Sequence, residues 1–341
     1  MSTTTTTRVE PEGEVAEDAP RALKAAIGPS DRIFRGISRG GGFAVLAIMS
    51  LIGVFLTFRA LEALREAGWS FVTTEAWAPD SGEFGIAAVL VGTVLIAIVA
   101  ICIAVPLAIG TALYISEYAP ARFKSTLIGM VDLMAAVPSV VYGLWGAFFL
   151  QWNILGVSRW ISTWFGWIPF LDVESADPRD PLATMTVYTA STFIAGIVVA
   201  MMVTPIACSV MREVFSQAPA GEREGAYALG ATKWGMIRSV VLPYGKGGMI
   251  GGTMLGLGRA LGETIGVYMV ISPVFVIQPR ILESGANSVS SLIALRFGEA
   301  SPFALSALMA AGLALFLMTL VVNFAASSII ARSRSGAVSD A

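Results

Sequence analysis

An arginine and a glutamate lie four residues apart inside a glycine-rich apolar segment of the chain. Arg259 and Glu263 belong to the run Leu-Gly-Arg-Ala-Leu-Gly-Glu-Thr at 257–264. Residues at this spacing share one face of a helix, so the two side chains can form an ion pair. A charge inside a bilayer is costly and by default suggests a function. The alternative is a structural ion pair that joins helices.

The chemistry of this pair suits an anion. The guanidinium of Arg259 is a planar fork of donors that fits a phosphate-like oxyanion. Glu263 would hold Arg259 when no anion is bound, and it would keep the anion from binding too tightly to leave. We therefore predict that Arg259 and Glu263 line a substrate path.

Asp132 and Ser139 are two further candidates for this path. Asp132 precedes and Ser139 follows Pro138 in another apolar segment. Proline removes a backbone hydrogen bond, so Pro138 is expected to kink or interrupt a helix. Such a break can line a path because the freed carbonyls need polar surroundings, and a packing kink is the open alternative. A catalytic use of Asp132 and Ser139 is disfavoured because no base lies at a usable spacing.

A polar stretch at 212–246 lies between two very apolar segments and carries five Lys/Arg and three Glu. It predicts two short helices joined by a turn, too polar to cross a bilayer. The residues expected to begin and end these helices are Ser216 as a cap, Pro219 at the start, Gly230 in a left-handed conformation, Thr232 as a second cap and Pro243 as the stop. The stretch is either a solvated loop or a docking element for a cytosolic partner.

The composition restricts the class of protein. Of 341 residues, 55% are hydrophobic and 13% charged, and the mean hydropathy is +0.74. Soluble domains carry about 25% charged residues, so this is an integral membrane protein. A net charge of −2 argues against a nucleic-acid partner. With no histidine, and with Cys102 and Cys208 both in apolar runs, disulfide frameworks, the usual zinc sites and His-based triads are excluded, and no metal site is expected.

Apolar runs long enough for a bilayer, which takes roughly 20 residues, predict six transmembrane helices, with Asp132 inside the third and Arg259 and Glu263 inside the fifth. The expected spans are about 41–60, a segment within 85–116, 126–150, 186–210, 247–272 and 302–330. The unbroken apolar runs contradict the alternation of a barrel. In the fifth span, glycines recur every four residues at 248–256 and again at 258–266, which predicts close helix packing at the centre of a bundle, against a second subunit.

Lysine and arginine counts give an orientation. Fifteen lie on the side of the N-terminal tail and of 212–246, against six in the opposite connections. The positive-inside rule then places both termini and the polar stretch in the cytoplasm. We divide the chain into a disordered cytoplasmic tail at 1–39, a membrane domain at 40–331 and a cytoplasmic tail at 332–341.

The larger external connections, 61–84 and 151–185, are rich in tryptophan, and the second is acidic at its end. A tryptophan belt at the membrane interface is favoured over ligand contacts. A short helix at 157–168 is expected to lie on the outer surface. The acidic residues at 172–180 face either a partner or solvent.

The polar stretch resembles the EAA loop of ABC-importer permeases. The positions that carry this resemblance, and that would couple to an ATPase, are Glu224, Gly225, Ala226, Gly230, Leu242 and Pro243. Gly225 replaces the first alanine of the family pattern, and Val240 replaces an isoleucine.

Three further segments are similar to PstC-type permeases of bacterial phosphate ABC importers. They are Gly-Arg-Ala-Leu-Gly-Glu-Thr at 258–264, Tyr-Ile-Ser-Glu-Tyr at 114–118 and Val-Pro-Ser-Val-Val-Tyr-Gly at 137–143. The resemblance covers roughly 40–331, and the length before the first span and the run at 258–264 favour the C-type over the related A-type permease.

This resemblance implies an all-α, six-helix type I importer permease in the bacterial plasma membrane. It implies a heterodimer with a PstA-type permease, two ATPase copies inside and a phosphate-binding protein outside. It also implies that Arg259 and Glu263 act on inorganic phosphate. The chain has no Gly-x-x-x-x-Gly-Lys-[Ser/Thr] loop, so it needs no cofactor of its own, and the ATPase would bind ATP and Mg. Alternating access driven by the ATPase is the expected mechanism. The other readings are a permease for another oxyanion such as sulfate, an ion-coupled secondary anion carrier and, least favoured, a membrane enzyme.

Overall fold

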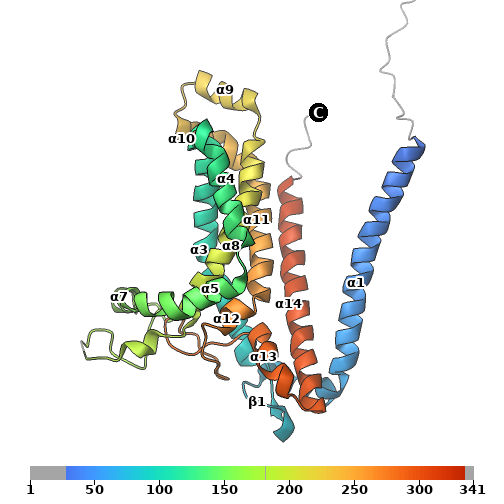
Figure 1. Cartoon of the computed structure of the whole chain (residues 1–341), viewed down its shortest axis with the longest axis vertical. Helices are drawn as coiled ribbons and strands as arrows, with labels where there is room; N and C mark the ends of the chain where they lie inside the picture. Colours follow the sequence, from blue (N-terminus) through green and yellow to red (C-terminus); the bar gives the residue numbers. More distant parts are fainter. Residues whose placement is uncertain (1–27, 181, 335–341) are drawn as a thin grey trace, which may run out of the picture. The chain divides into compact units, whose positions relative to one another are not determined.

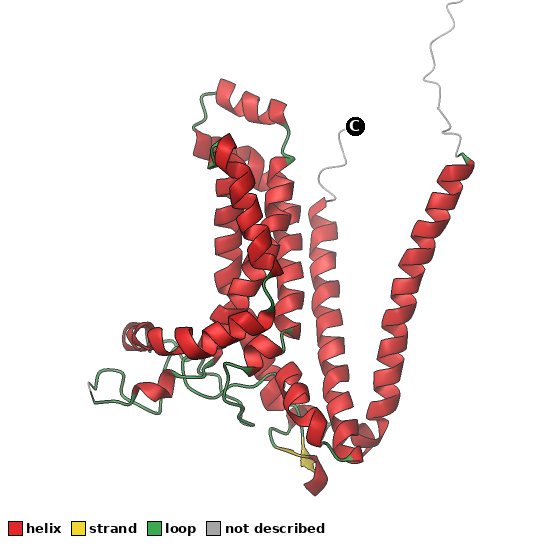
Figure 2. Ribbon diagram, viewed as in Figure 1, coloured by secondary structure: helices red, strands yellow, loops and turns green. Residues whose placement is uncertain are grey.

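The computed structural model describes residues 28–180 and 182–334, almost all of them helical or in connecting loops (Figures 1 and 2). The helices are α1 (Pro29–Ala67), α2 (Ser70–Thr73), α3 (Ala87–Leu113), α4 (Ala121–Ala136), α5 (Ser139–Trp145), α6 (Gln151–Asn153), α7 (Leu155–Phe165), α8 (Thr192–Ser216), α9 (Ala220–Ala228), α10 (Lys233–Met236), α11 (Leu242–Gly262), α12 (Ile265–Tyr268), α13 (Val289–Arg296) and α14 (Pro302–Arg334). Strands β1 (Trp77–Ala78) and β2 (Glu83–Phe84) form an antiparallel hairpin in which Trp77 pairs with Phe84.

The chain divides into two units at Leu51 and Ile52. The described part of the first unit is the beginning of α1, whose large apolar side chains, among them Phe34 and Phe43, are exposed. Because α1 begins at Pro29, residues 29–39 are helical, which corrects the prediction of a disordered tail for that part of 1–39. The rest of that prediction, at 1–27, and most of the predicted C-terminal tail lie outside the described residues.

Four helices among the described residues are long and apolar enough to cross a membrane: Pro29–Ala67, Ala87–Tyr118, Thr192–Ser216 and Pro302–Ala325. A fifth candidate is the pair Ala121–Ala136 and Ser139–Asn153, which is bent by 86°. This bend confirms the interruption predicted at Pro138. The phenol of Tyr142 donates to the carbonyl of Met134 at 2.9 Å across the break, which satisfies one of the freed acceptors.

The predicted fifth span, 247–272, is not one helix. Helix α11 ends at Gly262, and Glu263 has an extended backbone with ψ 126° before the short α12. Glycines and the charges of Lys246 and Arg259 lower the apolar content of α11. A sixth span at α11 therefore stays a prediction.

The core of the second unit forms where small residues let α3, α8 and α11 approach one another. Alanines of α3 such as Ala104 and Ala108 are fully buried. On α11, a Cβ added at Gly248 would lie 2.6 Å from Val214 of α8, and one at Gly256 would lie 2.5 Å from Val203. The first glycine row therefore packs against α8 of the same chain, and the contact of this span with a second subunit stays a prediction.

The two ends of the second unit differ. Helix α9 and the C-terminal end of α14 lie at one end, whereas α7, α13 and the hairpin of β1 lie at the other (Figure 1). This is the separation that the charge asymmetry predicts for a cytoplasmic and an external side.

Candidate functional site

Arg259 and Glu263 form the predicted ion pair, and the two partners are held very differently. The Arg259 Nη2 atom lies 3.8 Å from Glu263 Oε2, with 39% of the arginine side chain exposed against 7% of the glutamate. Arg259 is in the last turn of α11, where the negative end of the helix dipole favours a cation. The long distance and the exposure of Arg259 make it the movable partner.

Glu263 lies just beyond the end of α11, and two hydrogen bonds hold it in place. Its Oε1 accepts from the backbone N–H of Gly266 at 3.3 Å, and its own carbonyl accepts from the hydroxyl of Ser290 at 2.7 Å. The spacing alone predicts a glutamate inside a helix, whereas the structure places Glu263 at a break between α11 and α12.

A cavity of about 480 Å³ lies beside Arg259, between α8, α11 and α14. Thr319 and Asn323 of α14 add polar groups to its wall, and the rest of the lining, Ile206, Met254, Leu255 and Gly258, is apolar or small. A partly exposed guanidinium in a hollow of this size can bind an oxyanion through paired N–H donors.

Ser139 and Asp132 lie in different relations to this pair. Ser139 begins α5, and its carbonyl oxygen is 3.5 Å from where a Cβ on Gly266 would lie, so the break at Pro138 meets the break at Glu263. Asp132 is exposed on α4 and accepts from Ser209 of α8 at 3.3 Å. It forms none of the ion pairs found in the described ranges. The structure thus places the backbone of Ser139 next to Gly266, whose N–H donates to Glu263, while the hydrogen bond of Asp132 is made to α8.

The polar stretch forms the two short helices that its sequence predicts, α9 and α10. Gly230 between them has φ +85°, a left-handed conformation that favours glycine, and Thr232 caps α10 by accepting from Gly235 N–H at 3.1 Å. The exposed side chain of Glu224 and the open surface at Gly225 lie on α9, and Ala226 packs inward.

Two of the expected helix boundaries are wrong. Ser216 is the last residue of α8, and its hydroxyl donates to the carbonyl of Glu213. Pro219, by contrast, lies directly before the first residue of α9, as predicted for the start of this helix. Pro243 does not end a helix, because a π-helical segment at Ile237–Val241 leads directly into α11, where the proline is in the first turn. The missing N–H of a proline is tolerated at this position. Leu242 packs against the core, which leaves Pro243 exposed.

Residues 104–335 match the family described as binding-protein-dependent transport system inner membrane component. The chain belongs to this family. It is thus a multi-pass permease component of an inner-membrane transport system and not an ATPase, in agreement with the class that the sequence predicts. Among the described residues, no group of His, Cys, Asp and Glu could hold a metal ion.

Curated relatives carry the same resemblance over most of the permease. It is 38% identical over 303 residues to the phosphate transport system permease protein PstC 2 of Mycobacterium tuberculosis, covering 88% of this chain and 91% of the relative. It is 38% identical over 292 residues to PstC of Pasteurella multocida, covering 85% and 88%. These relatives confirm the resemblance to PstC-type permeases.

A solved structure supports the fold. The permease aligns with a chain of a bacterial ABC transporter involved in the import of the acidic polysaccharide alginate, with a TM-score of 0.52 and 17% identity, over 88% of this chain and 99% of that chain. The similarity shows that the permease shares the fold of that chain.

Three exposed apolar side chains near the turn between α9 and α10 were not among the residues that the sequence predicts for the site. Tyr227, Leu229 and Trp234 are 46%, 92% and 57% exposed. Their place in a segment too polar to enter the membrane could have indicated a protein contact, because exposed apolar clusters mark interaction surfaces.

An ion pair that fixes α9 to the rest of the second unit was also not predicted from the sequence. Arg223 Nη1 lies 3.1 Å from Oε2 of Glu117, whose side chain is 4% exposed, and Arg223 Nη2 donates to the carbonyl of Phe215 at 2.7 Å. The cation of Lys233 lies 4.7 Å from the ring of Tyr118. The permease therefore connects α9 and α10 directly to the π-helical segment Tyr114–Tyr118, which continues α3.

Proposed function

We propose that this permease is the PstC-type subunit of an ATP-driven phosphate importer. It spans the membrane six times, with both termini in the cytoplasm, and forms the path with a homologous PstA-type permease. A dimer of ATPase subunits binds inside, and a phosphate-binding protein docks outside. The names of the relatives, at 38% identity over 303 residues, support phosphate as the substrate.

The path centres on the Arg259–Glu263 pair. Phosphate displaces Glu263 from the guanidinium, because an oxyanion can accept two parallel N–H bonds from Arg259 while the present contact is 3.8 Å long. When phosphate leaves, Glu263 is already in place to pair with Arg259 again. Competition of this kind keeps the site from trapping the anion.

The observation that carries the coupling proposal is the projecting helix α9, which has an exposed carboxylate at Glu224 and exposed apolar groups beside it. The ATPase holds this helix, binds ATP and Mg, and moves the permease between two arrangements. The permease itself needs no cofactor. Glu117 and Arg223 transmit the motion from α9 to α3.

Co-purification of the ATPase with the permease tests this proposal. A Gly230→Val variant forces a β-branched side chain into a left-handed backbone, which costs about 1–2 kcal/mol and distorts the turn. We expect Gly230→Val and Glu224→Ala each to lower the amount of ATPase recovered with the permease in detergent.

Gly221→Ala is the matched control, because it lies on the same helix and a Cβ there has nothing within 4 Å. It should recover as much ATPase as the wild type. An ion-coupled secondary carrier would be favoured over the importer if no ATPase were recovered with the wild-type permease. Equal recovery of the ATPase with all three variants would show that α9 does not hold it.

A further inference from the structure

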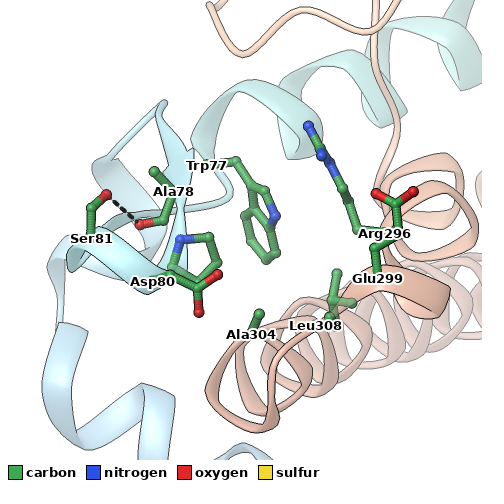
Figure 3. Close-up of a pocket in the computed structure, with 10 residues that line it drawn as sticks. Trp77, Ala78, Asp80, Ser81, Arg296, Glu299, Ala304 and Leu308 are labelled. Atoms are coloured by element: carbon green, nitrogen blue, oxygen red, sulfur yellow. Dashed lines mark hydrogen bonds between the residues drawn. The ribbon is translucent and has the colours of Figure 1, made fainter.

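A hollow of about 410 Å³ lies at the end of the second unit opposite to α9. Trp77, Pro79 and Asp80 line one side of it from the β1 hairpin, and Arg296 and Glu299 line the other side from the end of α13 (Figure 3). Ala304 and Leu308 of α14 form its floor. The phosphate path uses none of these residues.

The walls of this hollow are rigid although it opens to solvent. Pro79, Ala304 and Leu308 are buried. The hydroxyl of Ser301 donates to Asp80 Oδ1, and Ser301 Oγ accepts from the N–H of Ala304 in the first turn of α14. The hairpin is thereby fixed to α14, so the hollow exists before any partner binds.

The chemistry of the hollow suits a long basic side chain. Two exposed carboxylates, Asp80 and Glu299, and one exposed guanidinium, Arg296, give it a formal charge of minus one. Arg296 forms none of the ion pairs found in the described part of the chain. An aliphatic stem can pack on the partly exposed indole of Trp77, and a cation is attracted to the carboxylates and to the same indole.

We infer that this hollow receives a lysine or arginine side chain of the system's binding protein when that protein docks. The inference rests on the proposed function, because that function puts this end of the permease outside the membrane, where a binding protein arrives. A basic anchor in a rigid pocket is the kind of contact that carries much of the energy of a protein interface.

The test uses the whole importer in lipid nanodiscs, with the phosphate-binding protein of the same organism as the probe. The measured quantity is the concentration of phosphate-loaded binding protein that gives half-maximal stimulation of ATP hydrolysis. Glu299→Lys puts a like charge in the hollow and should raise this concentration about tenfold. Arg296→Gln removes the competing cation and should lower it.

Misfolding of the Arg296→Gln variant could not lower the concentration of binding protein that gives half-maximal stimulation. The two variants together therefore distinguish an effect on docking from an effect on stability. Glu83→Lys is the matched control, because Glu83 is exposed on the same hairpin but outside the hollow, and it should behave as the wild type. The difference between the wild type and Glu299→Lys should shrink at high salt, because ions screen exposed charges.

Wild-type behaviour of Glu299→Lys, or a weaker response of Arg296→Gln, would overturn the docking inference and leave the proposed function intact. If the binding protein fails to stimulate even the wild-type importer, the proposed function itself is wrong, and the inference is lost with it.

Discussion

Glu263 and Arg259 differ in how firmly the protein holds them. Glu263 is 7% exposed and receives a backbone donor from Gly266, while Arg259 is 39% exposed at a distance of 3.8 Å. A purely structural ion pair would hold both partners. One fixed and one movable partner are better suited to an exchange of the carboxylate for an anion.

Arg259→Gln should abolish phosphate uptake, because the remaining amide lacks both the charge and the paired donors. It should leave the attached ATPase unchanged, because Arg259 is in the last turn of α11 and outside the exposed loop. Labelled phosphate uptake in vesicles measures the first effect, and co-purification measures the second.

The double variant Arg259→Gln/Glu263→Gln distinguishes a conducting role from a structural one. Loss of uptake in both variants agrees with a direct role of the guanidinium. Recovery of uptake in the double variant would show that only an unpaired Glu263 harmed the single variant, and that the pair is structural.

Some of these residues were accessible to sequence reasoning because their signals are local. The spacing of Arg259 and Glu263 predicts their contact, and the positions of Gly230 and Thr232 predict the turn. Arg223 and Glu117 are 106 residues apart in sequence, so their contact depends on how α9 folds back on α3, which no local pattern records. The same holds for Ser290, which reaches the carbonyl of Glu263 from α13.

At the level of elements, the sequence predicts which helix faces carry small residues and where a helix is interrupted. It does not predict which element packs there. The glycine row at 248–256 predicts close packing, yet any helix could supply the partner, and here α8 does. The sequence predicts that Pro243 ends a helix. In the structure a π-helical turn precedes it, and this wider turn accommodates the proline within one continuous helix.

The Arg223–Glu117 contact makes a prediction about coupling between elements. Removing one partner of a buried ion pair costs about 3–5 kcal/mol, and the partial exposure of Arg223 reduces this cost. Arg223→Gln should therefore lower the melting temperature and reduce the phosphate transported per ATP hydrolysed, while ATPase binding persists.

Glu117→Gln/Arg223→Gln should recover the melting temperature but not the transport ratio, because the buried charge is gone and the connection with it. Arg238→Gln, at an exposed arginine of the same loop, is the control and should match the wild type in both measurements. An unchanged transport ratio in the Arg223→Gln variant would remove the pair from the coupling route.

At the scale of the whole molecule, segments that charge patterning assigns to opposite sides of the membrane lie at opposite ends of the second unit. The cationic loop forms α9 at one end, and the tryptophan-rich connections form α7 and the hairpin at the other (Figure 1). The helical class and the interruption at Pro138 were also predictable. The number of six transmembrane helices is harder to predict from hydropathy, because α11 is rich in glycine and carries charges. We attribute these residues to packing and chemistry rather than to lipid contact.

The central claim is that a cytosolic motor drives phosphate past Arg259 through this permease. The most direct measurement is uptake of labelled phosphate and labelled sulfate by vesicles that contain the permease with its partner permease, ATPase and binding protein. We expect phosphate uptake that requires ATP and survives dissipation of ion gradients, with little sulfate uptake. Uptake that follows an ion gradient without ATP, or preference for sulfate, would contradict it.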